Sequence, residues 1–181
     1  EALAVRQSLK RHRMGSGFWD FSLAVYGAEA VAPECLSLQD KFGIDVNLLL
    51  LCAYVGAVRG VTLTVGDIVA ARAEVASWHK DIVKPLRSAR QRLKTIALPD
   101  AQTADAAAQL RTRVKAVELE SEHVEQILLE HWAEARLGSR PLSDSRDAVV
   151  ANVAALFKAY AVTEPLTAVT HLVDAALVQP K

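Results

Sequence analysis

The sequence predicts an all-α protein, a single-domain helical bundle of seven to eight helices with a long antiparallel helical hairpin. Three observations favour this fold. The run 46–58 is apolar apart from Asn47, as is typical of a helix buried on all sides. Two longer helical segments, 64–95 and 103–135, are similar in length and separated by a short turn, so they should fold back on each other. No segment has a convincing strand pattern.

Length and composition are those of one globular domain. The chain has 181 residues, of which 51% are hydrophobic and 23% charged, which is enough for a substantial core. Acidic and basic residues balance at 21 each, so any preference for nucleic acid or a membrane surface has to be local. We expect residues 18–181 to form the helical domain, and residues 1–17 to be a poorly ordered extension, whether native or added at the start.

Neither a membrane span nor a secretion signal is predicted. The apolar run 46–58 is shorter than the roughly 20 residues that cross a bilayer, and we recognise no signal peptide. Cys35 and Cys52 both lie in apolar helical contexts. This predicts two buried, reduced thiols, which agrees with a reducing compartment.

Local signals place the first three helices. The first helix covers about 18–26 and carries most of the aromatic residues of this region. Pro33 is expected in the first turn of the second helix, where proline is tolerated, and Gly43 suits its left-handed end. Asp45 is a good N-cap for the central helix, 46–59, because its carboxylate can accept hydrogen bonds from the free amides of the first turn.

The rest of the chain contains the hairpin and two shorter helices. Thr64 and Asp67 have the spacing of a capping box at the start of the first hairpin helix. Pro85 lies inside that helix and should kink or split it, because proline removes an amide and clashes with the chain one turn back. After the second hairpin helix, we expect helices at about 144–161 and 165–178.

An apolar seam is expected to hold the hairpin together. Residues of the second hairpin helix repeat at spacings of four and three, as in a coiled coil of about three heptads. They are Leu110, Val114, Val117, Ser121, Val124, Leu128 and His131 or Trp132. If one side of this seam stays unburied, it could instead serve self-association.

Charge is unevenly divided along the hairpin. Cations gather near the turn, whereas the glutamates between 118 and 134 lie further along the stem, where we expect most of them to be too far away to neutralise the turn. One hypothesis is therefore an anionic partner bound by Lys84, Arg87, Arg90, Lys94, Arg111 and Arg113. The alternative is a solvated helix face. No aromatic residue is interleaved with these cations, so a nucleic acid could be bound only through its phosphates.

Four short elements together resemble a known family. They are Trp-Asp at 19–20, Leu-Gln-Asp at 38–40, Gly-Ile-Asp-Val-Asn-Leu-Leu at 43–49 and Pro-Leu-Arg at 85–87. The stretch of about 18–129 that contains them is similar to DUF2390, a bacterial family of small helical proteins known only as a domain of unknown function. The resemblance implies a cytoplasmic bacterial protein. It implies no activity, cofactor or catalytic residue.

A ligand pocket is a second hypothesis. Polar and amphipathic side chains are scattered through the apolar first third of the chain, and pockets are apolar with a few convergent polar groups. The lining would be Trp19, Gln39, Asn47 and Tyr54, with Arg87 as a cation. The alternative is that these residues are helix caps and paired polar groups of the core.

No catalytic or metal site is predicted. Glu120 and His123 form a single Glu-x-x-His element, whereas a di-iron bundle needs two copies and two more glutamates. The cysteines lack zinc spacing, and no glycine motif for a nucleotide or a nucleophile elbow occurs. We therefore expect no cofactor, no metal ligand and no catalytic residue.

The function that this pattern predicts is a non-enzymatic interaction or regulatory module that docks an anionic partner at a basic hairpin tip. The partner would be a protein or another anionic molecule; the pattern supports a nucleic acid less, and no membrane insertion is expected. The alternative is a small-molecule-binding protein or an enzyme with a pocket near Trp19, Gln39, Asn47 and Arg87. A deep cavity at these residues would favour the alternative, and a closed core would favour the module.

Overall fold

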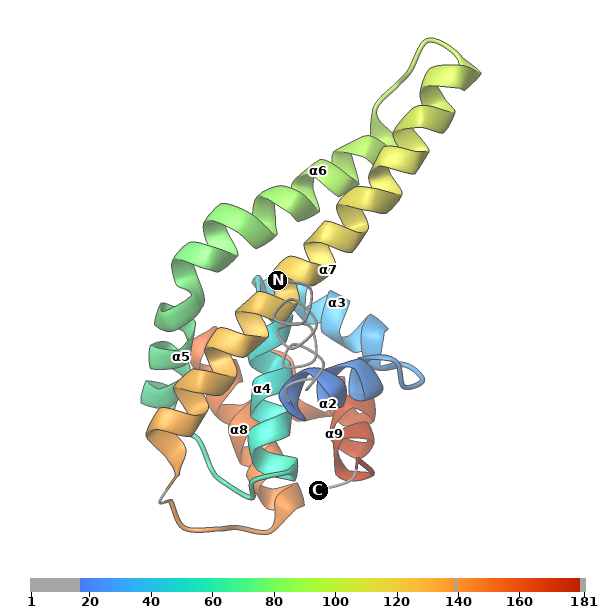
Figure 1. Cartoon of the computed structure of the whole chain (residues 1–181). Helices are drawn as coiled ribbons and strands as arrows, with labels where there is room; N and C mark the ends of the chain where they lie inside the picture. Colours follow the sequence, from blue (N-terminus) through green and yellow to red (C-terminus); the bar gives the residue numbers. More distant parts are fainter. Residues whose placement is uncertain (1–16, 139, 180–181) are drawn as a thin grey trace, which may run out of the picture.

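The computed structural model describes residues 17–138 and 140–179, and its fold is all-α, as predicted (Figure 1). Apart from an isolated antiparallel bridge between Val61 and Leu142, the described residues form only helices, turns and loops. The α-helices are α2 (Gly17–Tyr26), α3 (Val31–Phe42), α4 (Val46–Ala57), α5 (Val65–Trp78), α6 (Lys84–Thr95), α7 (Ala101–Leu137), α8 (Ser145–Ala159) and α9 (Thr170–Leu177). A π-helical turn, His79–Val83, joins α5 to α6, and a 3₁₀ turn, Leu166–Val169, leads into α9.

The helical domain begins one residue earlier than the sequence predicts. Gly17, which we assigned to the N-terminal extension, is the first residue of α2. The remainder of that expected extension, residues 1–16, lies outside the described residues. Within the described chain, no helix combines the length and the apolarity needed to cross a bilayer.

Helix α4 is the centre of the fold. It contacts α2, α3, α5, α7, α8 and α9, and every residue from Asn47 to Ala57 is buried, so the apolar run is enclosed on all sides as predicted. Its start is fixed locally: Gly43 ends α3 in the left-handed region with φ 65°, and Asp45 Oδ1 accepts a hydrogen bond from the Asn47 amide. Both are the caps that the sequence predicts.

Helix α8 crosses α4 closely, and Asn152 fixes the chain around this crossing. The Asn152 side chain is fully buried. Its Nδ2 donates to the carbonyl oxygens of Cys52 and Val61, and its Oδ1 accepts from the Leu63 amide. Buried polar groups need hydrogen-bond partners. One side chain of α8 supplies them to backbone groups of α4 and of the link to α5.

The long helix that we expected at 64–95 is split by the π-helical turn. Its start carries the predicted capping box between Thr64 and Asp67. The Lys84 amide donates to the His79 carbonyl, five residues back. Pro85 follows directly; it has no amide to donate, and its ring excludes a carbonyl one turn back. Widening the helix ahead of Pro85 accommodates both defects, and the chain bends at this point (Figure 1).

Helices α6 and α7 form the predicted antiparallel hairpin, and its outer part projects away from the body (Figure 1). The predicted apolar seam is wrong for three of its members, whereas Ser121 and Trp132 are buried and Val114 and Leu128 half-buried. Leu110, Val117 and Val124 are 42%, 48% and 38% exposed. The face of α7 that is buried at this level carries Glu118, Ser121 and Glu125, which are buried, and Glu122, which is half-buried. Helix α7 is rotated because its neighbours here present arginine and histidine rather than apolar side chains.

The close α4–α8 crossing predicts opposite effects for two helical glycines. A Cβ on Gly56 would lie 2.5 Å from Val149 N and 2.7 Å from Val149 Cα, both backbone atoms. Gly56→Ala should therefore lower the free energy of unfolding by about 1–3 kcal/mol, the usual cost of overpacking. At Gly66 the nearest atom to a Cβ is Thr64 Oγ1 at 3.6 Å. Gly66→Ala should leave stability unchanged or raise it by up to about 1 kcal/mol. Urea unfolding measures the stability of both variants. Equal stabilities would contradict the close approach of α8 to α4 at Gly56.

The two thiols should react only after unfolding. Cys35 and Cys52 are buried and free, and burial raises the pKa of Cys35 to about 12 and raises that of Cys52 as well. Since the thiolate is the reactive form, a thiol reagent at neutral pH should label the native protein orders of magnitude more slowly than the protein in urea. Labelling of the native chain within minutes, measured by mass spectrometry, would show that one of these helices opens.

Candidate functional site

The buried polar face of α7 is the least usual feature of the molecule. We define this polar face as Glu118, Ser121, Glu122, Glu125 and Gln126. Glutamate is almost never buried in proteins unless it is paired. These side chains face residues of α4, the π-helical turn and α6, so each carboxylate can be followed to its partners.

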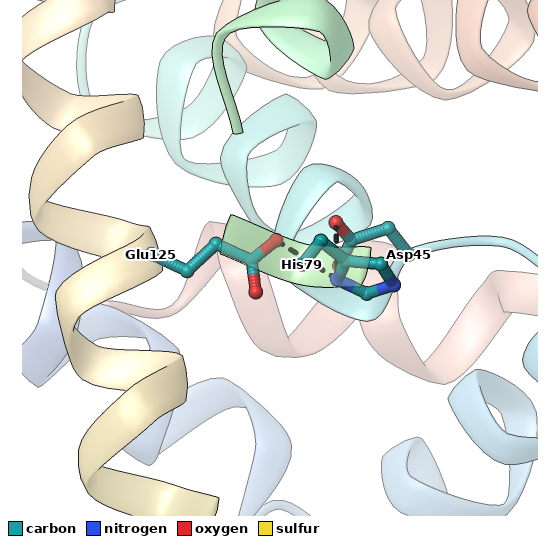
Figure 2. Close-up of side chains that lie close together, drawn as sticks. All are labelled: Asp45, His79 and Glu125. Carbon is teal, nitrogen blue, oxygen red and sulfur yellow. Dashed lines mark hydrogen bonds and ion pairs between the residues drawn. The ribbon is translucent and has the colours of Figure 1, made fainter. Parts of the chain in front are cut away.

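Asp45, His79 and Glu125 form a compact group at the inner end of this face (Figure 2). Their ligand-type atoms all lie within 4.8 Å of one another. His79 Nδ1 lies 3.0 Å from Glu125 Oε1 and 3.3 Å from Asp45 Oδ2, so the two carboxylates approach the same nitrogen. The Glu125 side chain is fully buried, and those of Asp45 and His79 are only 7% and 14% exposed. We call these three residues the Asp45–His79–Glu125 cluster.

The second oxygen of each carboxylate is held by Asn47. Asp45 Oδ1 accepts from the Asn47 amide at 2.9 Å, and Glu125 Oε2 accepts from Asn47 Nδ2 at 3.0 Å. Asn47 Oδ1 in turn accepts from Gln126 Nε2 at 2.9 Å. The oxygen of the Gln126 side-chain amide, Oε1, is buried without a hydrogen-bond partner among the described residues. Asn47 therefore orients both carboxylates toward His79.

Charges in the cluster are balanced by protons. Burial and the nearby Glu125 raise the pKa of Asp45 to about 8, so this carboxyl group holds a proton at neutral pH. Burial alone would lower the pKa of His79, but its hydrogen bond to Glu125 and the charge of Asp45 raise it overall. Burial would raise the pKa of Glu125, yet hydrogen bonds from His79 and Asp45 lower it. These shifts favour a protonated His79 and an ionised Glu125 beside a neutral Asp45.

Arg87 of α6 pairs with the next turn of the polar face. Its Nη1 donates to Gln39 Oε1 at 2.7 Å, its Nη2 to Glu122 Oε1 at 2.8 Å and its Nε to Glu118 Oε1 at 3.4 Å. Arg90 also binds Glu118, through Nε and Nη2. Arg87 therefore joins α3, α6 and α7. We call this set of contacts the Arg87 bridge.

This bridge corrects one sequence-based expectation. We expected most of the glutamates between 118 and 134 to lie too far along the stem to neutralise the cations of the hairpin. Glu118 and Glu122 pair directly with Arg87 and Arg90. Of the other residues in the expected binding set, Lys84, Lys94 and Arg113 are exposed, and Arg111 is half-buried. The set thus divides into arginines that are used within the fold and cations that face solvent.

The residues of the expected pocket are used mainly within the protein. Gln39 and Arg87 bind each other, and Asn47 lies in the Asp45–His79–Glu125 network. Trp19 stacks on the His123 ring with centroids 4.2 Å apart, and Tyr54 packs against Phe18 and Phe21. Two surface hollows elsewhere on the molecule are lined by other residues, one between α8 and α9 and one beside the end of α7.

Sequence reasoning missed the Asp45–His79–Glu125 cluster. Asp45 was expected only as a cap, and His79 has no glutamate three residues before it, so it forms no second Glu-x-x-His element. His79 and Glu125 are 46 residues apart in the chain and come from different helices. A search for ligand spacing within one helix does not detect such a group. The available signal was a histidine close to a proline that breaks its helix.

Comparison with known proteins gives a family. A family model described as "Protein of unknown function (DUF2390)" matches residues 17–129, which is more than half of the chain. The match ends shortly after the polar face of α7, so it includes Asp45, His79, Glu125 and the Arg87 bridge. No curated protein and no solved structure matches the chain.

Removal of the Arg87 side chain should lower the free energy of unfolding far more than removal of an exposed arginine of the same hairpin. Arg87→Ala leaves Glu122 without its cation and weakens the compensation of Glu118, and an uncompensated buried charge is strongly destabilising. We expect the free energy of unfolding to fall by about 2–3 kcal/mol, because Arg90 still binds Glu118. The matched change Arg113→Ala should stay within about 0.5 kcal/mol of the unchanged protein.

A second substitution checks the cause. Glu122→Gln in the Arg87→Ala background removes the uncompensated charge and should restore part of the lost stability in urea unfolding. If Arg87→Ala and Arg113→Ala cost the same, or if Glu122→Gln restores nothing, the bridge does not hold the hairpin to α3.

Proposed function

The chain belongs to the DUF2390 family, whose function is unknown, and we propose that it is a non-enzymatic interaction module whose hairpin docks an acidic, amphipathic helix of a partner protein. The docking element is the outer part of the hairpin, residues 91–117, which we call the outer arm. The observation that carries the proposal is that this arm projects from the body (Figure 1) while exposing apolar and cationic side chains together.

Exposed apolar side chains on the arm and just below it support a helical partner. Leu110, Val117 and Val124 are exposed and follow each other at intervals of seven residues on α7, so they form one stripe along the helix. Ile96 and Leu98 add exposed apolar surface at the tip. A stripe with heptad spacing is the surface that a second helix packs against in a coiled coil, and apolar surface gathered in one place is typical of an interaction site.

The charges of the outer arm select an acidic partner. The arm carries Arg92, Lys94, Arg111, Arg113 and Lys115, against Asp100 and Asp105. Within the described residues, none of these cations has a carboxylate within 4.0 Å, unlike Arg87 and Arg90. Unpaired cations around an apolar stripe favour a partner whose acidic residues flank an apolar face, because complementary charge speeds encounter and fixes the register.

A protein partner agrees better with the arm than a nucleic acid does. The segment 91–117 contains no phenylalanine, tyrosine or tryptophan, so it offers no surface on which bases could stack. A phosphate backbone would satisfy the cations but would leave the apolar stripe in water. An amphipathic helix satisfies both, and it is the occupant we propose.

We place this module in the bacterial cytoplasm. The support is the pair of buried free thiols, Cys35 and Cys52, because free cysteines are typical of reducing compartments. The alternative function, a small-molecule site near Trp19, Gln39, Asn47 and Arg87, gains no support from the geometry, since the polar atoms of Gln39, Asn47 and Arg87 already bind protein groups.

Photo-crosslinking in native cells tests the docking surface. A benzoylphenylalanine in place of Val117 lies on the stripe, whereas one in place of Val69, an exposed position on α5, lies on the body. We expect a crosslinked protein at Val117 and none at Val69, and the captured segment should be an acidic amphipathic helix. Arg113→Glu with Lys115→Glu should reduce the adduct about tenfold or more, as should a rise in salt concentration in cell extract.

The matched charge control is Lys158→Glu, which reverses an exposed cation on α8 and should leave the adduct unchanged. A nucleic-acid adduct, an adduct with a second copy of the chain, or equal adducts at Val117 and Val69 would each overturn the proposal. Circular dichroism and urea unfolding of the double variant verify that the fold is intact, which is expected because Arg113 and Lys115 are exposed.

A further inference from the structure

The geometry points to a second site, independent of the outer arm: we propose that the Asp45–His79–Glu125 cluster binds one divalent cation of the first transition row, such as Zn²⁺ or Mn²⁺. The ligands would be Asp45 Oδ2, His79 Nδ1 and Glu125 Oε1, which come from the start of α4, the π-helical turn and the middle of α7 (Figure 2).

Convergence on one nitrogen is the first argument. Nδ1 of an imidazole carries at most one hydrogen, so it can donate to only one of the two carboxylates that approach it at 3.0 and 3.3 Å. Three potential ligand atoms that lie within 4.8 Å of one another are the grouping that a cation requires. Ligands bonded at about 2.0–2.2 Å to one ion lie roughly 2.8–3.6 Å apart in octahedral or tetrahedral geometry, a range that includes both distances.

Charge is the second argument. When an ion replaces the protons that otherwise balance the cluster, two carboxylates and a neutral imidazole leave two negative charges in a place that is almost closed to solvent, and buried charges must be paired or bound to a metal. Arg87, which pairs with the polar face one turn away, is already engaged by Gln39, Glu118 and Glu122. One divalent cation neutralises the cluster completely.

The surroundings hold the three ligands in place. Asn47 binds the outward oxygen of both carboxylates, and Gln126 fixes Asn47. Such outer partners orient metal ligands and tune their affinity. The π-helical turn starts at His79, and single π turns within α-helices occur frequently at functional sites. The partly exposed His79 side chain marks the side from which an ion and its remaining water ligands reach the cluster.

Ligand type decides the class of cation. One imidazole nitrogen with two carboxylate oxygens suits Zn²⁺, Mn²⁺ or Fe²⁺, because imidazole binds the first transition row well and carboxylates accept all three. Mg²⁺ prefers oxygen ligands and keeps several waters, so it should compete poorly. No sulfur takes part in the cluster, which argues against the soft Cu⁺.

Metal titration of the untagged full chain tests the site. After treatment with a chelator, the protein should bind one Zn²⁺ or one Mn²⁺ per chain in calorimetric titration, with its melting temperature raised by the ion, and Mg²⁺ should bind at least tenfold more weakly. Bound Mn²⁺ should show coupling to a single imidazole nitrogen in pulsed electron paramagnetic resonance. This spectrum is measured on the unchanged protein and does not depend on any variant folding.

Two variants separate the ligand role from the structural role. Asp45→Asn keeps an N-cap, since asparagine caps as well as aspartate, and Glu125→Gln keeps an oxygen that can accept from Asn47. Each should lower the affinity for the ion about a hundredfold or more, because it removes a direct ligand. His131→Ala, which removes an exposed histidine elsewhere on α7, should change the affinity less than twofold.

Clear results would overturn the proposal. Absence of binding at millimolar Zn²⁺ and Mn²⁺, no nitrogen coupling in the Mn²⁺ spectrum, or equal affinities for Asp45→Asn and the unchanged protein would each exclude this site. Because the cluster lies apart from the outer arm, failure here leaves the crosslinking result at Val117 untouched, and the reverse also holds.

Discussion

Burial of carboxylates along α7 is the constraint on which the rest of the structure depends. Helix α7 has 37 residues and runs from the body of the protein into the outer arm (Figure 1). Where it meets α6 and the π-helical turn, the contact is made by Glu118, Glu122 and Glu125. A buried carboxylate without compensation is strongly destabilising, so α7 can adopt only the rotation in which Arg87, Arg90 and His79 face these glutamates.

This rotation explains the exposed stripe. The residues of α7 with heptad spacing would form an interior seam if α6 offered an apolar face. Since α6 offers arginines at this level, the acidic face turns inward and Leu110, Val117 and Val124 turn outward. The internal charge pairs and the external apolar surface are therefore two consequences of one helix orientation. For the docking role proposed above, this orientation would keep the apolar stripe exposed.

Pro85 connects the hairpin to the candidate metal site. By interrupting the helix, it places a π-helical turn at His79–Val83, and the widened turn directs His79 toward Asp45 and Glu125 (Figure 2). The same proline that gives the arm its bend thus helps to assemble the cluster at its base. Occupation of the cluster by a cation would strengthen the attachment of α7 to α4, because its ligands belong to both sides.

The sequence by itself determined the features that local chemistry controls: the buried helix α4, the caps at Gly43, Asp45 and Thr64, the break ahead of Pro85 and the antiparallel hairpin. Each of these depends on residues within about one helical turn, on an apolar run, or on two long helices joined by a short turn. The tertiary structure alone decided which face of α7 is buried, which cations are paired and which three residues form the cluster. Asn47 and Glu125 are 78 residues apart. Periodicity identifies a face of a helix but not its neighbour, so a charged face that is buried against matching charges looks, in sequence, like a face turned to solvent.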